Sequence, residues 1–190
     1  MSSVLYIHGF ASSSKSLKAQ QTKHWFEQHH PEIKLMIPDL SVHPIKAYEQ
    51  LTELYQSAPN VAVMGSSLGG FYATALHQQF GCPAVLINPG VRPADRLVGY
   101  IGENQFWHSG QSFTFTEDDV FALRNLEVET DRFPERLWLM VQTHDETLDF
   151  KQATKRYCLS KNTIEFGGDH SFQNFDRFLP RIYDFFASFA

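Results

Sequence analysis

Residues 65–69 carry the clearest chemical signal in the sequence. They read Gly-Ser-Ser-Leu-Gly, a G-x-S-x-G pattern between a short apolar run and a helical run. In this pattern a strand turns into a helix within one residue, and the flanking positions must be glycine because a Cβ there would collide with the turn. The central serine then projects at the N-terminus of the helix, whose N–H groups favour developing negative charge. The pattern therefore predicts Ser67 as the nucleophile of an acyl-transfer reaction.

Other uses of a glycine-rich turn compete with this interpretation. A purely structural turn between a strand and a helix can carry the same five residues. A phosphate-binding P-loop would end in Gly-Lys-Ser/Thr, and a dinucleotide-binding turn would read G-x-G-x-x-G, and the sequence contains neither motif. The structural turn is the alternative that the motif alone leaves open.

An acidic residue and a histidine follow two later apolar runs, in the order that α/β-hydrolase triads take along the chain. Asp145 comes soon after the run 137–141, and His170 comes soon after the run 163–166. The expected chemistry is that His170 accepts the hydroxyl proton of Ser67 while Asp145 orients the imidazole ring. A histidine in a glycine-rich turn is also common as a plain surface residue, which is the alternative for His170.

Two further aspartates compete with Asp145 for the role of the acid. Asp149 lies where a helix is expected to begin, and we expect its carboxylate to cap that helix. Asp169 adjoins His170 in the sequence, so its side chain would need an unusual turn to reach the same ring. Asp145 is therefore the predicted acid.

The first apolar run supplies the remaining part of the predicted site. It is followed by the turn His8-Gly9-Phe10, and a His-Gly-x turn at this place commonly provides the second donor of an oxyanion hole. The predicted donors are the backbone N–H groups of Phe10 and Leu68. We expect His8 to be structural, because a triad needs one base and His170 is better placed.

Six short apolar runs alternate with helical patterns along the chain, and these elements must position the chemical groups. Near-continuous apolar runs are typical of strands buried on both faces of a parallel sheet. The sequence therefore predicts a compact α/β-hydrolase fold with about six mostly parallel strands, helices on both faces, and the functional residues at the carboxyl ends of the strands. The predicted strands are residues 4–7, 34–37, 61–64, 84–87, 137–141 and 163–166.

Residues 100–117 interrupt this rhythm of strand and helix. Phe113 and Phe115 alternate as they would in one strand of a short hairpin. We expect the segment to form a small cap over the mouth of the site, in which Phe106 and Trp107 contact the substrate. The alternative is a hairpin that only packs on the surface.

Composition limits the classes of function. The 190 residues are 43% hydrophobic, which fits one folded domain over residues 1–190 and is too apolar for a disordered chain. A net charge of −5 and the lack of a basic stripe argue against nucleic acid as a partner. No stretch approaches the roughly 20 apolar residues of a membrane span, and no signal-peptide pattern is present. We expect a cytoplasmic protein without a stable membrane anchor that acts on a small molecule, and the sequence indicates no oligomeric state.

The histidines and cysteines do not indicate a metal site. His24, His29 and His30 cluster, but a metal would need a further set of well-spaced ligands, so we interpret them as a solvated helix end. Cys82 and Cys158 are too few for a disulfide framework, which favours a reducing compartment, and both are expected to be packing residues. The predicted chemistry requires no metal and no organic cofactor.

With these motifs in place, the sequence resembles the YqiA-type esterases, a small bacterial family of the α/β-hydrolase superfamily. The resemblance implies hydrolysis of carboxylic esters, with acyl-CoA thioesters as a further substrate class. It implies Ser67 as nucleophile, Asp145 as acid and His170 as base. It extends over nearly the whole chain through LYIHGF (residues 5–10), GSSLGG (65–70), NPGVRP (88–93), QTHDE (142–146) and GGDH (167–170).

One residue departs from the family pattern, and one other function stays open. Members of the family tend to carry glycine where this chain has His144, in the loop next to the predicted acid. The alternative function is a non-catalytic ligand-binding or sensor protein on the same fold, because such proteins can retain all three triad residues.

Overall fold

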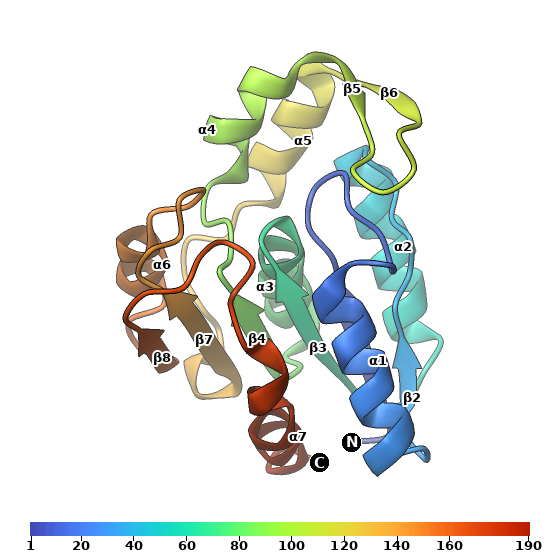
Figure 1. Cartoon of the computed structure of the whole chain (residues 1–190), viewed down its shortest axis with the longest axis vertical. Helices are drawn as coiled ribbons and strands as arrows, with labels where there is room; N and C mark the ends of the chain where they lie inside the picture. Colours follow the sequence, from blue (N-terminus) through green and yellow to red (C-terminus); the bar gives the residue numbers. More distant parts are fainter.

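Six strands form one parallel sheet in the computed structural model, which describes residues 1–190 (Figure 1). The strand order is β2-β1-β3-β4-β7-β8, and every neighbouring pair is parallel. The predicted α/β-hydrolase fold with six parallel strands is therefore confirmed. The strands are β1 (Ser3–Ile7), β2 (Lys34–Met36), β3 (Val61–Ser66), β4 (Ala84–Ile87), β7 (Leu137–Gln142) and β8 (Lys161–Glu165).

Burial explains which strands the apolar pattern could locate well. Every residue of β1, β3, β4 and β7 is buried, so these strands are apolar over almost their whole length. The edge strand β8 is largely exposed and begins at Lys161, two residues before the predicted Thr163. It ends at Glu165, and the expected last residue, Phe166, lies outside the strand and is 91% exposed. An edge strand needs no apolar face on its free side, and this is why its start and end differ from the prediction.

Helices cover both faces of the sheet, as the alternation of side chains along a strand requires. Val4 and Tyr6 of β1 belong to the hydrophobic cluster under α1 and α7, which lie on the near side of the sheet in Figure 1. Leu5 and Ile7 belong to the cluster under α2, α3 and α6. The helices are α1 (Leu17–His29), α2 (Pro44–Gln56), α3 (Leu68–Phe80), α4 (Pro93–Leu97), α5 (Glu117–Leu126), α6 (Phe150–Arg156) and α7 (Leu179–Ala187).

Between β4 and β7 the chain passes beyond the carboxyl ends of the strands and then returns to the other end of the sheet, where β7 begins (Figure 1). We call these residues, 88–136, the insertion. It contains α4, the 3-10 turn Val98–Tyr100, an antiparallel hairpin and α5. The hairpin pairs β5 (Gly102–Gln105) with β6 (Ser112–Phe115), within the segment where a hairpin was expected. The insertion is larger than that segment, because α4 and α5 flank the hairpin and pack against each other.

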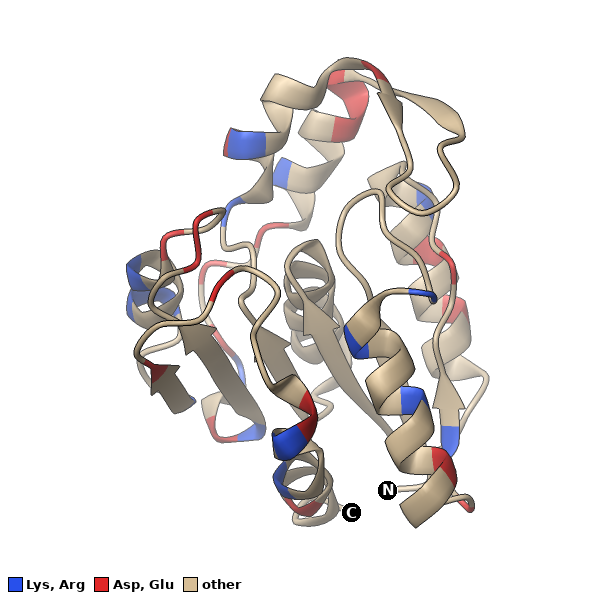
Figure 2. Cartoon of the chain, viewed as in Figure 1, with Lys and Arg blue, Asp and Glu red and all other residues tan.

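Charged residues of both signs are interspersed on the surface. Figure 2 shows basic and acidic residues along α1, α2 and α7. None of the helices combines the length and the apolar character that crossing a bilayer requires.

The two cysteines differ in their environment. Cys82 is buried in the core, as predicted, and burial raises the pKa of its thiol to about 12. The prediction that Cys158 is a packing residue is wrong, because this residue is exposed. It follows the end of α6, where Tyr157 takes the buried position and the next residue faces solvent.

Candidate active site

Ser67 stands at the turn between β3 and α3, in a conformation that L-residues rarely adopt. Its φ is 57° and its ψ is −121°. A Cβ on Gly65 would overlap the Gly69 carbonyl, and a Cβ on Gly69 would overlap the Ile7 carbonyl of the neighbouring strand β1. The expectation that both flanking positions require glycine is therefore confirmed. Two hydrogen bonds of 3.0 Å hold the turn in place: the Ser67 N–H donates to Ile87 O, and the Gly70 N–H donates to Ser67 O.

Ser67, His170 and Asp145 form one continuous line of hydrogen-bonding groups. His170 Nε2 lies 3.1 Å from Ser67 Oγ, and His170 Nδ1 lies 2.8 Å from Asp145 Oδ2. The Asp145 side chain is 2% exposed, whereas that of His170 is 24% exposed. The three side chains come from the loops after β3, β7 and β8, whose carboxyl ends meet at one edge of the sheet.

The carboxylate of Asp145 is fixed by its own loop. Its Oδ1 accepts the backbone N–H groups of Thr147 and Leu148, each at 2.8 Å. Both oxygens lie within reach of His170 Nδ1, Oδ1 at 3.0 Å and Oδ2 at 2.8 Å. The backbone thus fixes one carboxylate oxygen, while the other has the imidazole alone as its partner.

The two competing aspartates have other partners. Asp149 is the N-cap of α6 and accepts the Lys151 N–H at 3.0 Å, which confirms the expected cap. Asp169 accepts hydrogen bonds from Ser171 and Gln173, and these bonds lower the pKa of its carboxyl group. Neither carboxylate makes a hydrogen bond to the imidazole of His170.

The predicted oxyanion donors belong to two segments that meet at Ser67, the start of α3 and the loop after β1. Leu68 is the first residue of α3, so its N–H has no acceptor within the helix. The N–H of Phe10 donates to no protein acceptor. A Cβ on Gly9 would lie 3.3 Å from Ser67 Cβ, so the loop after β1 runs directly against the serine. Two free N–H groups are thus available beside the Ser67 hydroxyl.

His8 has the structural role that was expected. It is buried, its Nε2 accepts the Leu40 N–H at 3.2 Å, and its Nδ1 lies 2.9 Å from Gly9 O. Because an N–H donates to Nε2, the proton of the neutral ring must be on Nδ1. Burial lowers the pKa of His8, which favours this neutral form. The ring therefore ties the loop after β1 to the loop after β2.

Two buried amides that the sequence analysis missed hold the His170 loop. Asn88 Nδ2 donates to the carbonyl oxygens of Asp169 and His170, at 3.0 and 3.1 Å, and its Oδ1 accepts the Gln142 N–H at 3.0 Å. Gln142 Oε1 accepts the N–H groups of Asp169 and Gln173. The signal available in the sequence is a polar residue at the carboxyl end of each apolar run, at Asn88 and Gln142.

Glu146 is a third missed residue, next to the predicted acid in the sequence. Its Oε2 accepts the backbone N–H of His170 at 3.0 Å. The loop after β7 therefore holds His170 by two carboxylates, with Asp145 on the ring and Glu146 on the backbone. A second acidic residue beside Asp145 was the signal for this contact.

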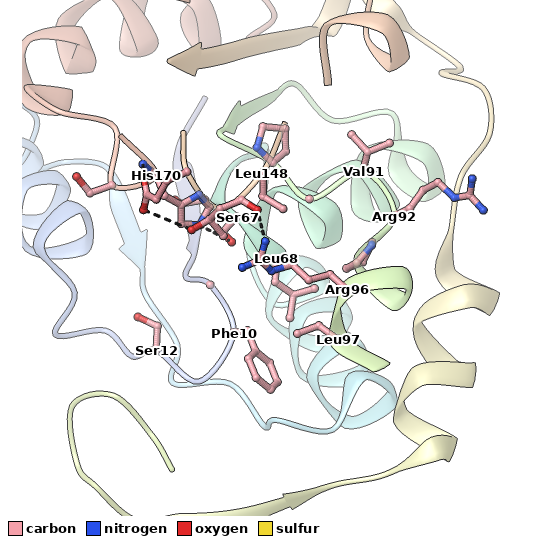
Figure 3. Close-up of a pocket in the computed structure, with 18 of the residues that line it drawn as sticks. Phe10, Ser12, Ser67, Leu68, Val91, Arg92, Arg96, Leu97, Leu148 and His170 are labelled. Atoms are coloured by element: carbon pink, nitrogen blue, oxygen red, sulfur yellow. Dashed lines mark hydrogen bonds between the residues drawn. The ribbon is translucent and has the colours of Figure 1, made fainter. Parts of the chain in front are cut away.

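Ser67 and His170 line a cavity of about 770 Å³, which we call the Ser67 cavity. Figure 3 shows the side chains of its lining around Ser67. Trp107 and Tyr100 of the insertion line it, and Trp107 is 72% exposed. Phe106 does not line this cavity: it packs on Phe113 with ring centroids 4.9 Å apart and borders a separate, smaller cavity.

The insertion is fastened over the loop after β1. The Trp107 N–H donates to Ala11 O at 3.0 Å, and the ring of Phe10 makes edge contacts with Tyr100, Phe113 and Phe115. The hairpin thus packs on the loop that carries one of the predicted oxyanion donors. The hairpin therefore contacts the loop that carries Phe10, and it also covers part of the protein surface.

The remaining histidines lie away from the Ser67 cavity. His144 is exposed, its ring lies 5.1 Å from that of Phe166, and its N–H donates to Gly167 O at 3.1 Å. His29 and His30 lie at the end of α1, where His30 stacks on Tyr183 with centroids 3.6 Å apart. No group of three or more His, Cys, Asp or Glu side chains is arranged to hold a metal ion.

Comparison with known proteins identifies the family. The uncharacterised protein family UPF0227, which is the YqiA family, matches residues 3–187. The chain therefore belongs to this family and is a YqiA-type α/β-hydrolase, as the resemblance of its motifs predicted.

Solved structures with little sequence identity share the fold. Est1E from Butyrivibrio proteoclasticus is 14% identical with a TM-score of 0.68, over 98% of this chain and 86% of that one. Alpha/beta hydrolase domain-containing protein 10 from mouse is 13% identical with a TM-score of 0.73, over 99% and 90% of the two chains. A structure from work on the metagenome-derived lipolytic enzymes LipS and LipT is 13% identical with a TM-score of 0.66, over 98% and 93%. At these identities the likeness concerns the fold.

Proposed function

We propose that this member of the YqiA family is a serine esterase that hydrolyses carboxylic esters through an acyl-enzyme. Ser67 is the nucleophile, His170 the general base and Asp145 the acid that orients it. The observation that carries the proposal is the unbroken line from Ser67 Oγ to His170 Nε2, at 3.1 Å, and from His170 Nδ1 to Asp145 Oδ2, at 2.8 Å. Lipolytic enzymes and an esterase among the proteins of the same fold add support.

The tautomer of His170 follows from its neighbours. A buried carboxylate can only accept, so Nδ1 carries the proton of the neutral ring and Nε2 presents a lone pair to Ser67. In the acylation step Ser67 Oγ bonds to the acyl carbonyl carbon while its proton passes to Nε2. Asp145 stabilises the imidazolium that results.

The carbonyl oxygen of the substrate becomes an oxyanion in this step. The N–H groups of Phe10 and Leu68 are free to donate to it, and donors fixed before the reaction stabilise such charge strongly. The bond to the leaving group then breaks, and the leaving atom takes the proton from His170 Nε2. Water repeats the sequence on the acyl-enzyme, with His170 again as base, and releases the carboxylic acid.

Labelling with a fluorophosphonate probe together with turnover of 4-nitrophenyl butyrate tests the proposal. Wild type and the Ser66→Ala control, which alters the neighbouring serine, are expected to show both labelling and turnover. Ser67→Ala is expected to lose both, with its melting temperature retained. Labelling of Ser67→Ala would reject Ser67 as nucleophile.

The same experiment separates the esterase from the alternative of a ligand-binding or sensor protein. A sensor that retains the triad would be labelled by the probe but would turn over esters negligibly. A screen across acyl lengths, with acyl-CoA thioesters included, would then compare the two substrate classes that the family resemblance implies.

A further inference from the structure

Three basic side chains line the Ser67 cavity. Arg92 lies 3.2 Å from the carboxylate of Asp95. Arg96 donates to the carbonyl oxygen of Thr147, and neither Arg96 nor Lys18 has a carboxylate within 4.0 Å of its charged group. Lys18 is therefore one of two basic groups of the cavity whose charge is not paired.

Lys18 makes one hydrogen bond within the protein. Its Nζ donates to the carbonyl oxygen of Ser171 at 2.6 Å. An ammonium group has three N–H donors, so two donors and the positive charge are left for a group that enters the cavity.

The position of Lys18 is unfavourable in the absence of a ligand. It lies in the first turn of α1, where the helix dipole disfavours a cation, and neither an acidic residue nor a side-chain cap from Ser16 offsets this. Its side chain is half-buried, and desolvation lowers the pKa of the ammonium to about 8, although the charges of Asp169 and Asp145 act in the opposite direction. Residues that break local rules in this way concentrate at functional sites.

Lys18 lines the Ser67 cavity next to the His170 loop. The leaving atom must come within reach of His170 Nε2, because that nitrogen returns the proton. Ser171, whose carbonyl holds the Lys18 ammonium, is the next residue along the chain. A charged group on the leaving alcohol or thiol would therefore meet Lys18 soon after it passes His170.

The apolar part of the lining lies elsewhere. Figure 3 shows Phe10, Leu68 and Leu97 together, across Ser67 from His170. Leu68 and Leu97 belong to one hydrophobic cluster, and Phe10 packs against it. An apolar acyl chain fits this side, where Figure 3 also shows Arg96 beside Leu68 and Leu97.

We propose that Lys18 recognises an anionic group on the leaving part of the substrate, so that the preferred substrates are esters or thioesters of an anionic alcohol or thiol. This inference rests on the proposed function and adds the substrate class. The hydroxyl groups of Ser12 and Ser16, which line the cavity just before Lys18 in the chain, are further donors for such an anion.

A matched pair of thioesters tests the proposal. S-butyryl 3-mercaptopropionate carries a carboxylate on the leaving thiol, and S-butyryl 3-mercaptopropionamide is its neutral counterpart. A thiol reagent measures the release of the free thiol from each substrate. Wild type is expected to prefer the carboxylate roughly tenfold in kcat/KM, the worth of one hydrogen bond to a charged group. Lys18→Met is expected to bring this ratio to about one while changing kcat/KM on the neutral thioester by less than about threefold. The preference of wild type should decline above about pH 8, where Lys18 loses its proton.

Two controls accompany this variant. Lys23→Met removes an exposed lysine of the same helix, 3.8 Å from Glu27, and is expected to retain the preference. A second substrate pair, 4-nitrophenyl hydrogen glutarate and its amide, carries the charge on the acyl part instead, and Lys18→Met is expected to leave its ratio unchanged. Melting temperatures report whether each variant is folded.

Each other outcome overturns the inference. An equal loss on both thioesters would make Lys18 a positioning residue that acts on the His170 loop through Ser171. A Lys18-dependent preference in the glutarate pair would place the anion on the acyl side. If wild type hydrolyses both thioesters with equal kcat/KM, the role of Lys18 alone is rejected. If wild type shows neither turnover nor probe labelling, the proposed hydrolase function itself is rejected.

Discussion

The substitution Asp145→Asn tests how the acid controls the tautomer of His170. Asp145 Oδ1 accepts two backbone N–H groups, from Thr147 and Leu148, and Oδ2 lies 2.8 Å from His170 Nδ1. Oδ1 also lies 3.0 Å from His170 Nδ1, so Oδ2 is the oxygen that has the imidazole alone as its partner, and an amide in place of the carboxylate has one favourable orientation.

An asparagine has to turn its carbonyl oxygen toward the two backbone N–H groups. The opposite orientation would set its NH2 group against two donors, at a cost of about 1–3 kcal/mol for each group left unsatisfied. In the orientation that remains, the NH2 group faces His170 Nδ1 and donates to it. The proton of the neutral ring must then be on Nε2, which can no longer accept the proton of Ser67.

This reasoning sets the magnitude of the effect. The wrong tautomer costs roughly 10⁴-fold in kcat in the serine protease triad that has served as the general template. At 1.36 kcal/mol for each factor of ten, this is about 5.5 kcal/mol of transition-state stabilisation. Because the two backbone N–H groups prevent the amide from flipping, we expect Asp145→Asn to lower kcat by a factor close to this one.

The assay is kcat/KM on 4-nitrophenyl butyrate for Asp145→Asn and for two matched controls. Asp149→Asn should stay near wild type, because asparagine caps a helix about as well as aspartate does. Asp169→Asn should also stay near wild type, because its carboxylate makes no hydrogen bond to the imidazole of His170. Near wild-type activity of Asp145→Asn, with an inactive control at either other position, would refute the assignment of the acid.

Two further predictions concern the insertion and the buried histidine. Trp107→Ala is expected to impair long acyl esters more than acetates, by up to about 0.8 kcal/mol, or fourfold, for each CH2 that the indole no longer covers. Phe106→Ala is the matched control, because Phe106 borders a different cavity, and an equal effect of Trp107→Ala on all chain lengths would contradict a role in acyl binding. Burial lowers the pKa of His8, so the unfolded chain binds a proton there that the folded chain does not, and the free energy of unfolding should fall as the pH is lowered through about 6.5, the ordinary pKa of histidine. Urea unfolding should show a smaller fall for His8→Gln, whose amide oxygen can still accept the Leu40 N–H, and an unchanged fall would show that His8 does not contribute.

The sheet was predictable because its central strands are buried on both faces. That burial demands the near-continuous apolar runs by which β1, β3, β4 and β7 are found, and the chemical groups follow from the carboxyl ends of these runs. Residues at those ends come together in any parallel sheet, so Ser67, Asp145 and His170 could be grouped before any distance was known.

The insertion was less predictable, because its residues have more than one use. Phe106 and Trp107 are neighbours in the sequence and both aromatic, yet their side chains border different cavities. The backbone bond from Trp107 N–H to Ala11 O is a contact between distant segments, which no local pattern encodes. The flanking helices α4 and α5 extend the insertion beyond 100–117 for the same reason, since their packing on each other is tertiary.

The loop around His170 explains why two buried amides stand where apolar residues would otherwise be expected. Gly167, Gly168, Phe172 and Asn174 all have positive φ, and a backbone of this kind is strained at the two residues that are not glycine. Strain persists only where the surroundings determine the conformation, and here hydrogen bonds from Asn88 and to Gln142 do so.

Asn88 itself has a φ of 40°, so part of the strain lies in the residue that holds the loop. A Cβ on Gly168 would overlap the Gln142 side chain, which shows how closely loop and amide fit. Apolar residues at these two positions would leave the loop carbonyl and N–H groups unpaired, at about 1–3 kcal/mol each. The ends of β4 and β7 are therefore polar because the position of the base depends on them.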